Sequence, residues 1–143
     1  MSEIEFKIRC VPPKHTAQGS SMILKNFKTG KFFIGKKSNS NATQAKNELI
    51  ALIYPYAPQK PLVGALELSV VWKYPWRASE PKKNKLNGFR YCDTKPDADN
   101  LTKALADILT RLGFWQDDAQ VSILNFTKMW ADEPGIEIKI KEL

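Results

Sequence analysis

Two pairs of aspartates stand out in the sequence as candidates for chemistry. Asp97 and Asp99 lie one residue apart behind a proline, at the predicted start of a helix, and Asp117 and Asp118 precede a predicted strand. Carboxylates that lie side by side repel each other unless a cation binds between them. Mg²⁺ prefers hard oxygen ligands from a few aspartates and retains some of its waters. The acidic residues therefore fit a magnesium site, which in phosphodiester chemistry activates a bound water and stabilises charge on the leaving oxygen.

Each of these residues also has an ordinary structural explanation. An aspartate at a helix start can cap the helix, and an acidic pair in a loop is commonly a turn former. Asp99, Lys103 and Asp107 are spaced by four, so they share one helix face and can form an exposed ion-pair ladder. Lys103 can alternatively neutralise a phosphate oxygen in a transition state. Their combination in one segment favours the metal site over the separate explanations.

The basic residues are concentrated in one segment. Residues 73–95 hold seven basic and two acidic residues, which is +5 of the formal net charge of +7. A local basic excess is typical of a surface that binds the phosphate backbone of nucleic acid, although a solvated loop is an alternative. Because residues 75–96 show no helical or strand periodicity, they are predicted to form a long functional loop. The candidate DNA-binding residues are Lys73, Arg77, Lys82, Lys83, Lys85, Arg90 and Lys95.

Length and composition limit the possible classes of protein. With 143 residues and 43% apolar content, residues 1–143 are predicted to form one domain with one substantial core. Cys10 and Cys92 are too few for a disulfide framework and no secretory leader is seen, so we expect a cytoplasmic protein. No apolar run approaches the roughly 20 residues needed to cross a bilayer, and we expect no membrane-spanning role.

Hydrophobic periodicity predicts the elements that position these residues. Strands are predicted at Ile4–Cys10, as a hairpin at Ser21–Phe27 and Lys31–Lys36, at Leu66–Tyr74 as a central strand, at Val121–Trp130 and at Ile136–Ile140. One helix is predicted from Asn41 to Ile53, before Pro55. A second helix, from Asp99 to Leu112, carries a clean leucine stripe and precedes Gly113, a residue typical of helix ends.

The segment KPDADNLTKALADILTRLGFWQDDAQV, residues 95–121, resembles the signature of the RusA-type Holliday junction resolvases. The resemblance rests on the Asp-x-Asp-Asn pair, the lysine four residues beyond its second aspartate, Asp107, the Gly-Phe-Trp turn, and Asp-Asp-Ala-Gln-Val at matching spacing. It implies an α/β (α+β) fold with a mixed β-sheet and two main helices. It also implies a homodimeric crossover junction endodeoxyribonuclease that cuts four-way DNA with Mg²⁺.

The same resemblance assigns roles to individual residues. It implies that Asp97, Asp99 and Asp118 are the catalytic metal ligands, that Lys103 is the catalytic basic residue, and that Asp107 and Asp117 are supporting residues. A helix from Asp99 to Leu112 is roughly 20 Å long, so we expect the link after Gly113 to run back along the helix and return Asp118 to Asp99. If Asp118 lies near the helix C-terminus instead, either a partner subunit completes the site or the assignment is wrong.

The sequence therefore predicts a structure-selective endonuclease that makes two matched incisions in branched DNA. Because one small chain carries one site, a symmetric homodimer is expected. Two alternatives stay open, namely a non-catalytic nucleic-acid-binding module whose aspartates only cap and turn, and a Mg²⁺-dependent phosphohydrolase acting on nucleotides. Trp76, Phe89 and Tyr91 lie among the basic residues and can stack on bases or pack in the core.

Overall fold

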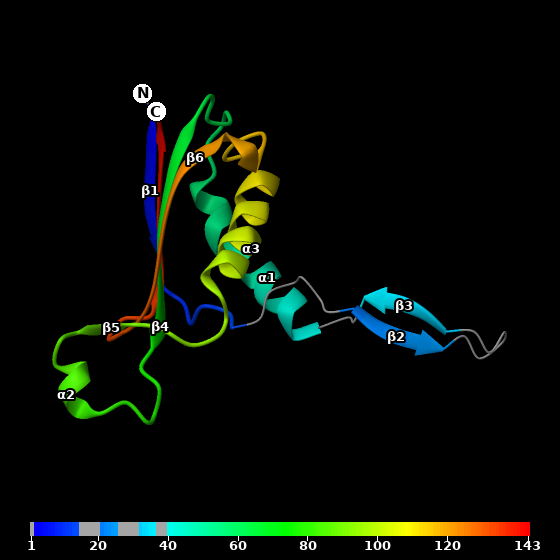
Figure 1. Cartoon of the computed structure of the whole chain (residues 1–143). Helices are drawn as coiled ribbons and strands as arrows, with labels where there is room; N and C mark the ends of the chain where they lie inside the picture. Colours follow the sequence, from blue (N-terminus) through cyan, green and yellow to red (C-terminus); the bar gives the residue numbers. More distant parts are fainter. Residues whose placement is uncertain (1, 15–20, 26–31, 37–39) are drawn as a thin grey trace.

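The computed structural model describes residues 2–14, 21–25, 32–36 and 40–143, and it describes side chains in residues 2–14 and 43–143. A five-stranded mixed sheet with strand order β1-β7-β4-β6-β5 forms one layer of the molecule (Figure 1). Its strands are β1 (Glu3–Ile8), β7 (Gly135–Glu142), β4 (Leu66–Pro75), β6 (Val121–Ala131) and β5 (Phe89–Tyr91). The β4–β6 pair is parallel and the other pairs are antiparallel, so the prediction of a mixed sheet is confirmed.

Strand β4 is the central strand that the sequence predicts, because it lies between β7 and β6. Every second residue from Leu66 to Tyr74 is buried, and the residues between them are half-buried. The buried side chains form the core together with the inward residues of β7 and β1. This alternation places one face of the sheet against the core and leaves the other face, with Lys73 and Glu137, open to solvent.

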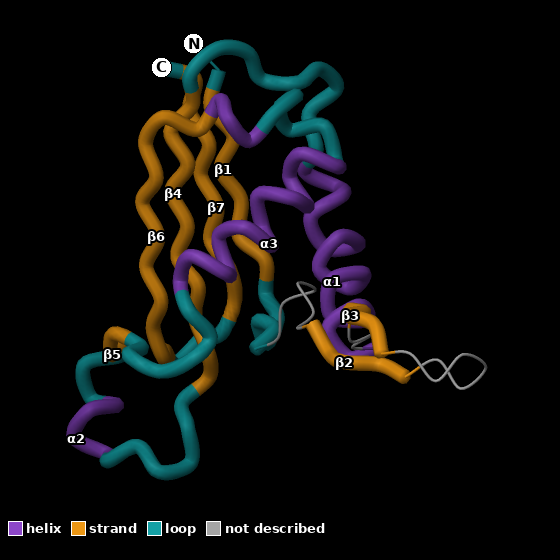
Figure 2. Tube along the Cα trace, turned by 45° about the vertical axis from the view of Figure 1, so that its right-hand side comes forward, coloured by secondary structure: helices purple, strands orange, loops and turns teal. Residues whose placement is uncertain are grey.

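Two helices, α1 (Ser40–Ile53) and α3 (Ala98–Arg111), cover a single face of the sheet (Figures 1 and 2). The leucine stripe of α3 packs into the core, with Leu101, Leu105 and Leu109 each at most 1% exposed. The burial of large apolar side chains is the main force that holds α3 against the sheet. The two main helices of the predicted fold are therefore confirmed.

Helix α3 ends in a hydrogen-bond pattern that the sequence GFW dictates. Gly113 has a φ of +81°, and its amide donates to the carbonyl of Thr110 at 3.1 Å. The amide of Phe114 donates to the carbonyl of Leu109 at 3.0 Å, which completes a Schellman motif. Phe114 and Trp115 are then buried, so the chain after the helix is tied to the core at this end.

The predicted long loop between β4 and α3 contains two short elements that the sequence did not reveal. These are the helix α2 (Lys82–Lys85) and the strand β5, which pairs with the end of β6. Both elements are too short to show a recognisable hydrophobic periodicity in the sequence. The prediction of a loop without regular structure is therefore wrong at these positions. We call residues 76–91, which protrude at the lower end of the sheet in Figure 1, the arm.

The remaining elements agree with the sequence in kind and differ at their ends. The strands β2 (Ser21–Lys25) and β3 (Phe32–Lys36) form a separate antiparallel pair, whereas the predicted turn between them lies outside the described residues. Strand β1 ends at Ile8 and does not continue to Cys10. Two single-turn 3₁₀ helices, η1 (Tyr54–Tyr56) and η2 (Asp118–Gln120), follow α1 and precede β6. Within the described ranges, every helix is too short or too polar to cross a bilayer.

Candidate active site

The first aspartate pair lies at the N-terminus of α3, where both side chains are exposed. Asp97 occupies the N-cap position, yet its side chain makes no capping hydrogen bond. Its carboxylate instead forms an exposed ion pair with Lys95, at 3.4 Å. Asp99 lies in the first helical turn, where the helix dipole stabilises negative charge. Helix capping therefore does not explain why Asp97 is an aspartate, and both carboxylates remain accessible to a ligand.

The segment that leads into this pair is held by a residue that the sequence analysis missed. Lys128, on β6, donates from Nζ to the carbonyl oxygen of Pro96 at 2.6 Å and to that of Thr94. The alternation along β6 places Lys128 on the same face as Phe126 and Trp130, toward the helices. The sequence signal for Lys128 is a lysine at an inward-facing position of a strand, because a buried cation needs hydrogen-bond or charged partners.

Lys103 lies one turn beyond Asp99 and is exposed. Among the described residues it forms no ion pair within 4.0 Å, so the ion-pair ladder with Asp99 and Asp107 is not formed. Its exposed ammonium can meet an anion that approaches the start of α3. This placement is compatible with the predicted role of Lys103 beside a phosphate.

The two members of the second aspartate pair, Asp117 and Asp118, lie in different surroundings. Asp117 caps η2, since its carboxylate accepts a hydrogen bond from the amide of Ala119 at 2.9 Å and Gln120 closes a reciprocal capping box. Turn formation therefore explains Asp117. Asp118 is exposed, and its pKa is raised, first by the neighbouring Asp117 side chain and also by the charge of Asp107. A carboxylate crowded by like charges gains most from a bound cation or a protonated partner.

The two acidic pairs do not converge within one chain. Asp118 lies close enough to Asp107 to be affected by its charge, and Asp107 is eight residues from Asp99, or about 12 Å along the helix. The link is fixed there because Phe114 accepts a hydrogen bond from the amide of Leu62, and Gln120 donates to the carbonyl of Leu62. In the described part of the chain, no three Asp, Glu, His or Cys side chains are grouped to hold a metal. The expected return of Asp118 to Asp99 is therefore wrong for a single protomer.

Donor chemistry at the start of α3 still fits a hard divalent cation. Asp97 and Asp99 offer exposed carboxylate oxygens, the ligands that Mg²⁺ prefers, and they leave room for waters. Two carboxylates are fewer than the predicted set of three. The third ligand must come from elsewhere for the predicted site to be complete.

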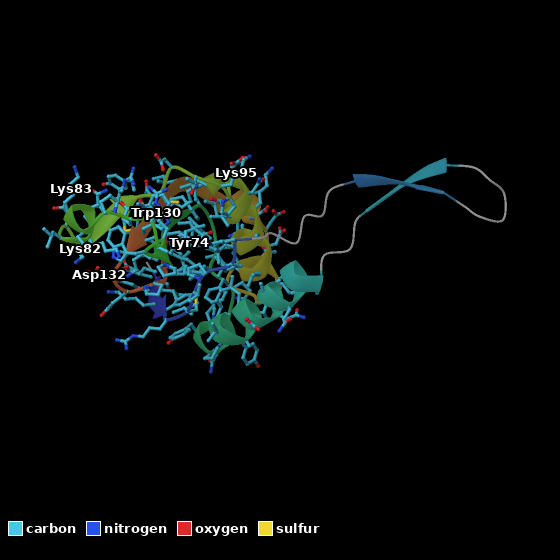
Figure 3. All side chains as sticks on the ribbon, turned by 90° about the horizontal axis from the view of Figure 1, so that it is seen from below. Tyr74, Lys82, Lys83, Lys95, Trp130 and Asp132 are labelled. Atoms are coloured by element: carbon cyan, nitrogen blue, oxygen red, sulfur yellow. The ribbon has the colours of Figure 1, made fainter. Side chains whose placement is uncertain are left out.

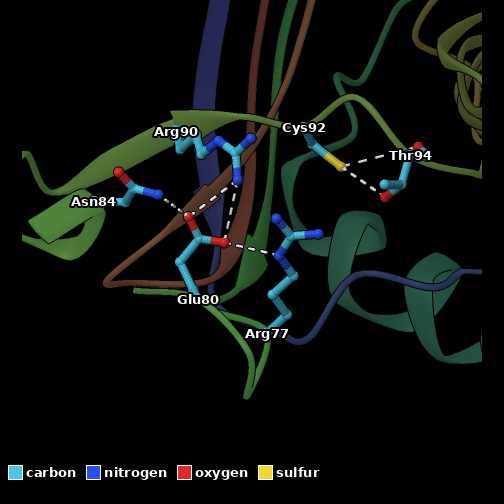
Figure 4. Close-up of polar contacts among 6 residues, drawn as sticks. All are labelled: Arg77, Glu80, Asn84, Arg90, Cys92 and Thr94. Atoms are coloured by element: carbon cyan, nitrogen blue, oxygen red, sulfur yellow. Dashed lines mark hydrogen bonds and ion pairs between the residues drawn. The ribbon is translucent and has the colours of Figure 1, made fainter. Parts of the chain in front are cut away.

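The arm is fastened to the sheet through a buried carboxylate. Glu80, whose side chain is 0% exposed, accepts hydrogen bonds from Arg77 at 2.7 Å, from Asn84 at 2.8 Å and from Arg90 at 3.1 Å (Figure 4). These hydrogen bonds lower the pKa of Glu80 to about 2, and the bond from Arg77 has the largest effect. The guanidinium groups of Arg77 and Arg90 also lie over the ring of Trp130, at 4.6 and 5.5 Å from its centre.

The seven candidate DNA-binding residues therefore differ in how far they are already engaged. Arg77 and Arg90 bind Glu80, and Lys73 forms an ion pair with Glu137 at 2.9 Å on the open face of the sheet. Lys82 and Lys83 are exposed on α2, at the outer side of the arm (Figure 3). Lys85 is half-buried on the same short helix, and Lys95 is exposed beside Asp97 near the start of α3.

The aromatic residues of the basic segment also separate into two groups. Trp76 donates a hydrogen bond to Asp132 at 2.7 Å and is half-buried, so it serves the structure of the arm. Phe89 and Tyr91 are 42% and 68% exposed and form an edge-to-face pair with their centres 5.5 Å apart. Leu86, on the same arm, is 87% exposed. Exposed aromatic groups beside lysines are a feature of surfaces that bind unstacked bases.

One edge of the sheet carries no partner strand over most of its length. Among the described residues, β6 pairs with β4 throughout, but on its other side it pairs only with β5, at residues 129–131. The free stretch, VSILNFT at residues 121–127, contains no charged residue and no proline. Ile123 and Leu124 on this stretch are 43% and 49% exposed. Uncharged apolar edges of this kind favour pairing with another strand.

Comparison with known proteins agrees with this architecture. The family model described as endodeoxyribonuclease RusA matches residues 11–141. This match covers most of the chain, and the protein belongs to the RusA endodeoxyribonuclease family.

Individual relatives match over shorter stretches. The chain is 35% identical over 78 residues to "Crossover junction endodeoxyribonuclease rusA" of Lactococcus phage r1t, which covers 54% of this chain and 55% of that protein. It is 48% identical over 48 residues to the RusA crossover junction endodeoxyribonuclease of Escherichia coli K12, over 33% of this chain and 40% of that protein. It is 32% identical over 93 residues to the Bacillus subtilis protein YqaN, over 62% and 65% of the two chains. The matches thus span 40% to 65% of these relatives.

Proposed function

We propose that this protein is a Mg²⁺-dependent, structure-selective endodeoxyribonuclease that resolves four-way DNA junctions by paired symmetric nicks, in DNA recombination and repair in the cytoplasm. The observation that carries the proposal is the exposed Asp97 at the start of α3, whose side chain makes no capping hydrogen bond and lies near Asp99. Lys103, which forms no ion pair within the described part of the chain, lies one turn beyond Asp99. Family membership and the names of the relatives support the choice of a junction as substrate.

In this proposal each residue at the start of α3 has one task. Asp97 and Asp99 hold the divalent cation, which, when bound, supplies charge stabilisation and a more acidic water. The N-terminus of α3 and Lys103 favour the binding of a scissile phosphate and stabilise the negative charge that grows on it. Lys95 releases Asp97 when the cation binds, because its exposed ion pair at 3.4 Å is weak.

We propose further that the active protein is a homodimer in which the free edge of β6 pairs antiparallel with the same edge of a partner subunit. Such a pair has a two-fold axis, which suits a substrate that needs two matched incisions. With the axis near Ile123 and Leu124, the two strands would pair over residues 121–126. Asp118 of the partner subunit, three residues before Val121, would then lie beyond this ladder, near the end of β5 where Tyr91 pairs with Met129. Lys128 is in this region and contacts the carbonyl of Pro96. Asp118 of the partner subunit would then complete the site of Asp97 and Asp99.

In this proposal the arm provides most of the contacts that bind DNA. Lys82, Lys83 and Lys85 of the arm, together with Lys95 before α3, bind backbone phosphates, whereas Lys73, Arg77 and Arg90 mainly hold the arm and the sheet in place. Phe89 and Tyr91 stack on bases exposed where the four strands exchange. A junction is favoured over a linear duplex because base stacking is interrupted where its strands exchange, so that unstacking a base costs less there.

The test is incubation of the protein with synthetic four-way, three-way and linear DNA, with and without Mg²⁺. The proposal predicts paired symmetric nicks that are confined to branched DNA and require Mg²⁺. Asp97→Asn should lose cleavage and keep junction binding, while Asp93→Asn, an exposed aspartate of the same segment, should behave like the wild type. Junction binding with no cleavage under any condition would instead identify a binding module, and release of phosphate from nucleotides alone would identify a phosphohydrolase.

A further inference from the structure

Lys128 lies at an unusual place for a lysine. It is half-buried, on the helix-facing side of β6, and its backbone carbonyl accepts a hydrogen bond from the amide of Cys92 at 2.9 Å. Its side chain reaches the same segment two and four residues further on, at the carbonyls of Thr94 and Pro96. Three hydrogen bonds thus join one residue of β6 to the chain that enters α3.

The partners of this lysine are also unusual. Among the described residues its ammonium has no carboxylate within 4.0 Å, and its two hydrogen-bond partners there are backbone carbonyl oxygens. A charged donor bound to neutral carbonyls forms stronger hydrogen bonds than an amide would. The carbonyl of Pro96 belongs to the peptide unit whose nitrogen is that of Asp97. The lysine therefore restrains the backbone from which the Asp97 carboxylate projects.

We propose that Lys128 is a positioning residue that fixes Asp97 and Asp99 in the geometry required to bind a divalent cation. The inference rests on the proposed function, because it assumes that these two carboxylates bind the cation. Asp97 lacks a capping hydrogen bond, and among the described residues its side chain pairs only with the exposed Lys95, so its own contacts restrain it little. Outer residues that orient metal ligands typically change metal affinity or activity by about 10- to 100-fold when they are replaced.

A general structural role for Lys128 makes a different prediction. If the lysine only stabilised the fold, its loss would lower the melting temperature and affect DNA binding and metal binding together. If it positions the carboxylates, metal binding should weaken while the arm, which is held separately by Glu80, continues to bind DNA. The two roles are therefore separable by measuring metal affinity and metal-free DNA affinity on the same variants.

The experiment uses the full chain and Mn²⁺ as a spectroscopic probe, with free Mn²⁺ measured by electron paramagnetic resonance. Lys128→Met removes the donor and keeps the aliphatic stem, Lys128→Gln keeps a shorter neutral donor, and Lys139→Met is the control. Lys139 is a lysine of the same sheet that forms an ion pair with Glu3 at 3.4 Å. Junction binding is measured in parallel without metal, and melting temperatures are measured for all variants.

The expected result is that Lys128→Met weakens Mn²⁺ binding about tenfold or more. Lys128→Gln should be intermediate, Lys139→Met should match the wild type, and junction binding without metal should stay within about twofold throughout. Equal Mn²⁺ affinity in Lys128→Met and wild type, or an equal loss of DNA and metal affinity, would overturn the inference and leave the proposed function intact. If Lys128→Met does not fold, the same comparison rests on Lys128→Gln. A wild-type protein that binds no Mn²⁺ would overturn the proposed function and the inference together.

Discussion

Asp118 lies close enough to Asp107, in the C-terminal half of α3, for the charge of Asp107 to help raise its pKa, whereas Asp99 lies about two helical turns from Asp107, at the start of the same helix. The helix acts as a spacer that keeps the two groups of carboxylates apart within one chain. The Schellman turn at Gly113 and the hydrogen bonds to Leu62 fix the link after the helix, so Asp118 cannot move to Asp99 without breaking them. If three carboxylates bind the cation, as we propose, the third would come from a second subunit.

Lys103→Met is expected to reduce junction cleavage by about 10²- to 10³-fold, the usual cost of removing one group that stabilises a transition-state anion. Junction binding should change by less than about twofold, because one lysine among many phosphate contacts adds little to affinity. Cleavage under single-turnover conditions and a gel-shift assay measure the two quantities. Arg111→Met, an exposed cation on the same helix, is the matched control. Equal losses in both assays for Lys103→Met would assign this residue to binding alone.

The double variant Lys82→Ala/Lys83→Ala is expected to bind junctions more weakly and with less dependence on salt. Each lost phosphate contact lowers the slope of log affinity against log salt concentration by about 1. Titrations at several salt concentrations measure this slope. Lys139→Ala/Lys141→Ala, on β7, removes the same charge from a different part of the surface and should leave the slope unchanged. An unchanged slope in the α2 variant would exclude this helix from the DNA interface.

The stability of the arm is expected to depend on pH, because Glu80 stabilises it only when its carboxylate is ionised. Its pKa falls from 4.5 to about 2 in the folded protein, so its ionised form stabilises the fold above pH 4.5, and this stabilisation disappears as the pH falls toward 2. Glu80→Gln should therefore melt at a lower temperature than the wild type at pH 7, and the difference should narrow between pH 4.5 and 2. Circular dichroism melting curves measure this, with Glu133→Gln, an exposed glutamate, as the control. A difference that does not vary with pH would contradict the lowered pKa.

The free edge of β6 is expected to be the dimer interface. Ile123→Lys/Leu124→Lys places like charges on both sides of the proposed two-fold axis and should convert dimers to monomers, since like charges on facing strands repel. Sedimentation equilibrium measures the mass, and cleavage should fall by at least about 100-fold because the third carboxylate is lost. Val63→Lys, which adds a charge at another exposed apolar residue, is the control. A double variant that stays dimeric would place the interface elsewhere.

The regular elements were predictable because their hydrophobic periods are strong. The leucine stripe from Leu101 to Leu109 indicates which face of α3 is buried. The alternation of apolar and polar residues in β4 and β7 indicates which face of the sheet is buried. The internal order of the arm was not predictable, because the partners of Glu80 lie three, four and ten residues away in a segment without a period.

The chemistry-bearing residues were predictable in type and only partly in position. Acid spacing and family resemblance select Asp97, Asp99 and Asp118, but the path of the chain after Gly113 depends on tertiary hydrogen bonds that no local pattern encodes. Lys128 was missed because a single lysine in a strand resembles ordinary surface charge until its inward register is known. The charge of the basic segment also does not show that three of its seven cations already bind Glu80 or Glu137.

The most direct test of the shared site is a mixed dimer of Asp99→Asn and Asp118→Asn subunits, purified with two different affinity tags. If the aspartates combine across the interface, one of the two sites in the mixed dimer retains Asp97 and Asp99 from the Asp118→Asn subunit and Asp118 from the other. The mixed dimer should then nick one strand of a four-way junction at about half the wild-type rate per dimer, while both parent homodimers are inactive. A mixed dimer as inactive as its parents would contradict a site shared between subunits.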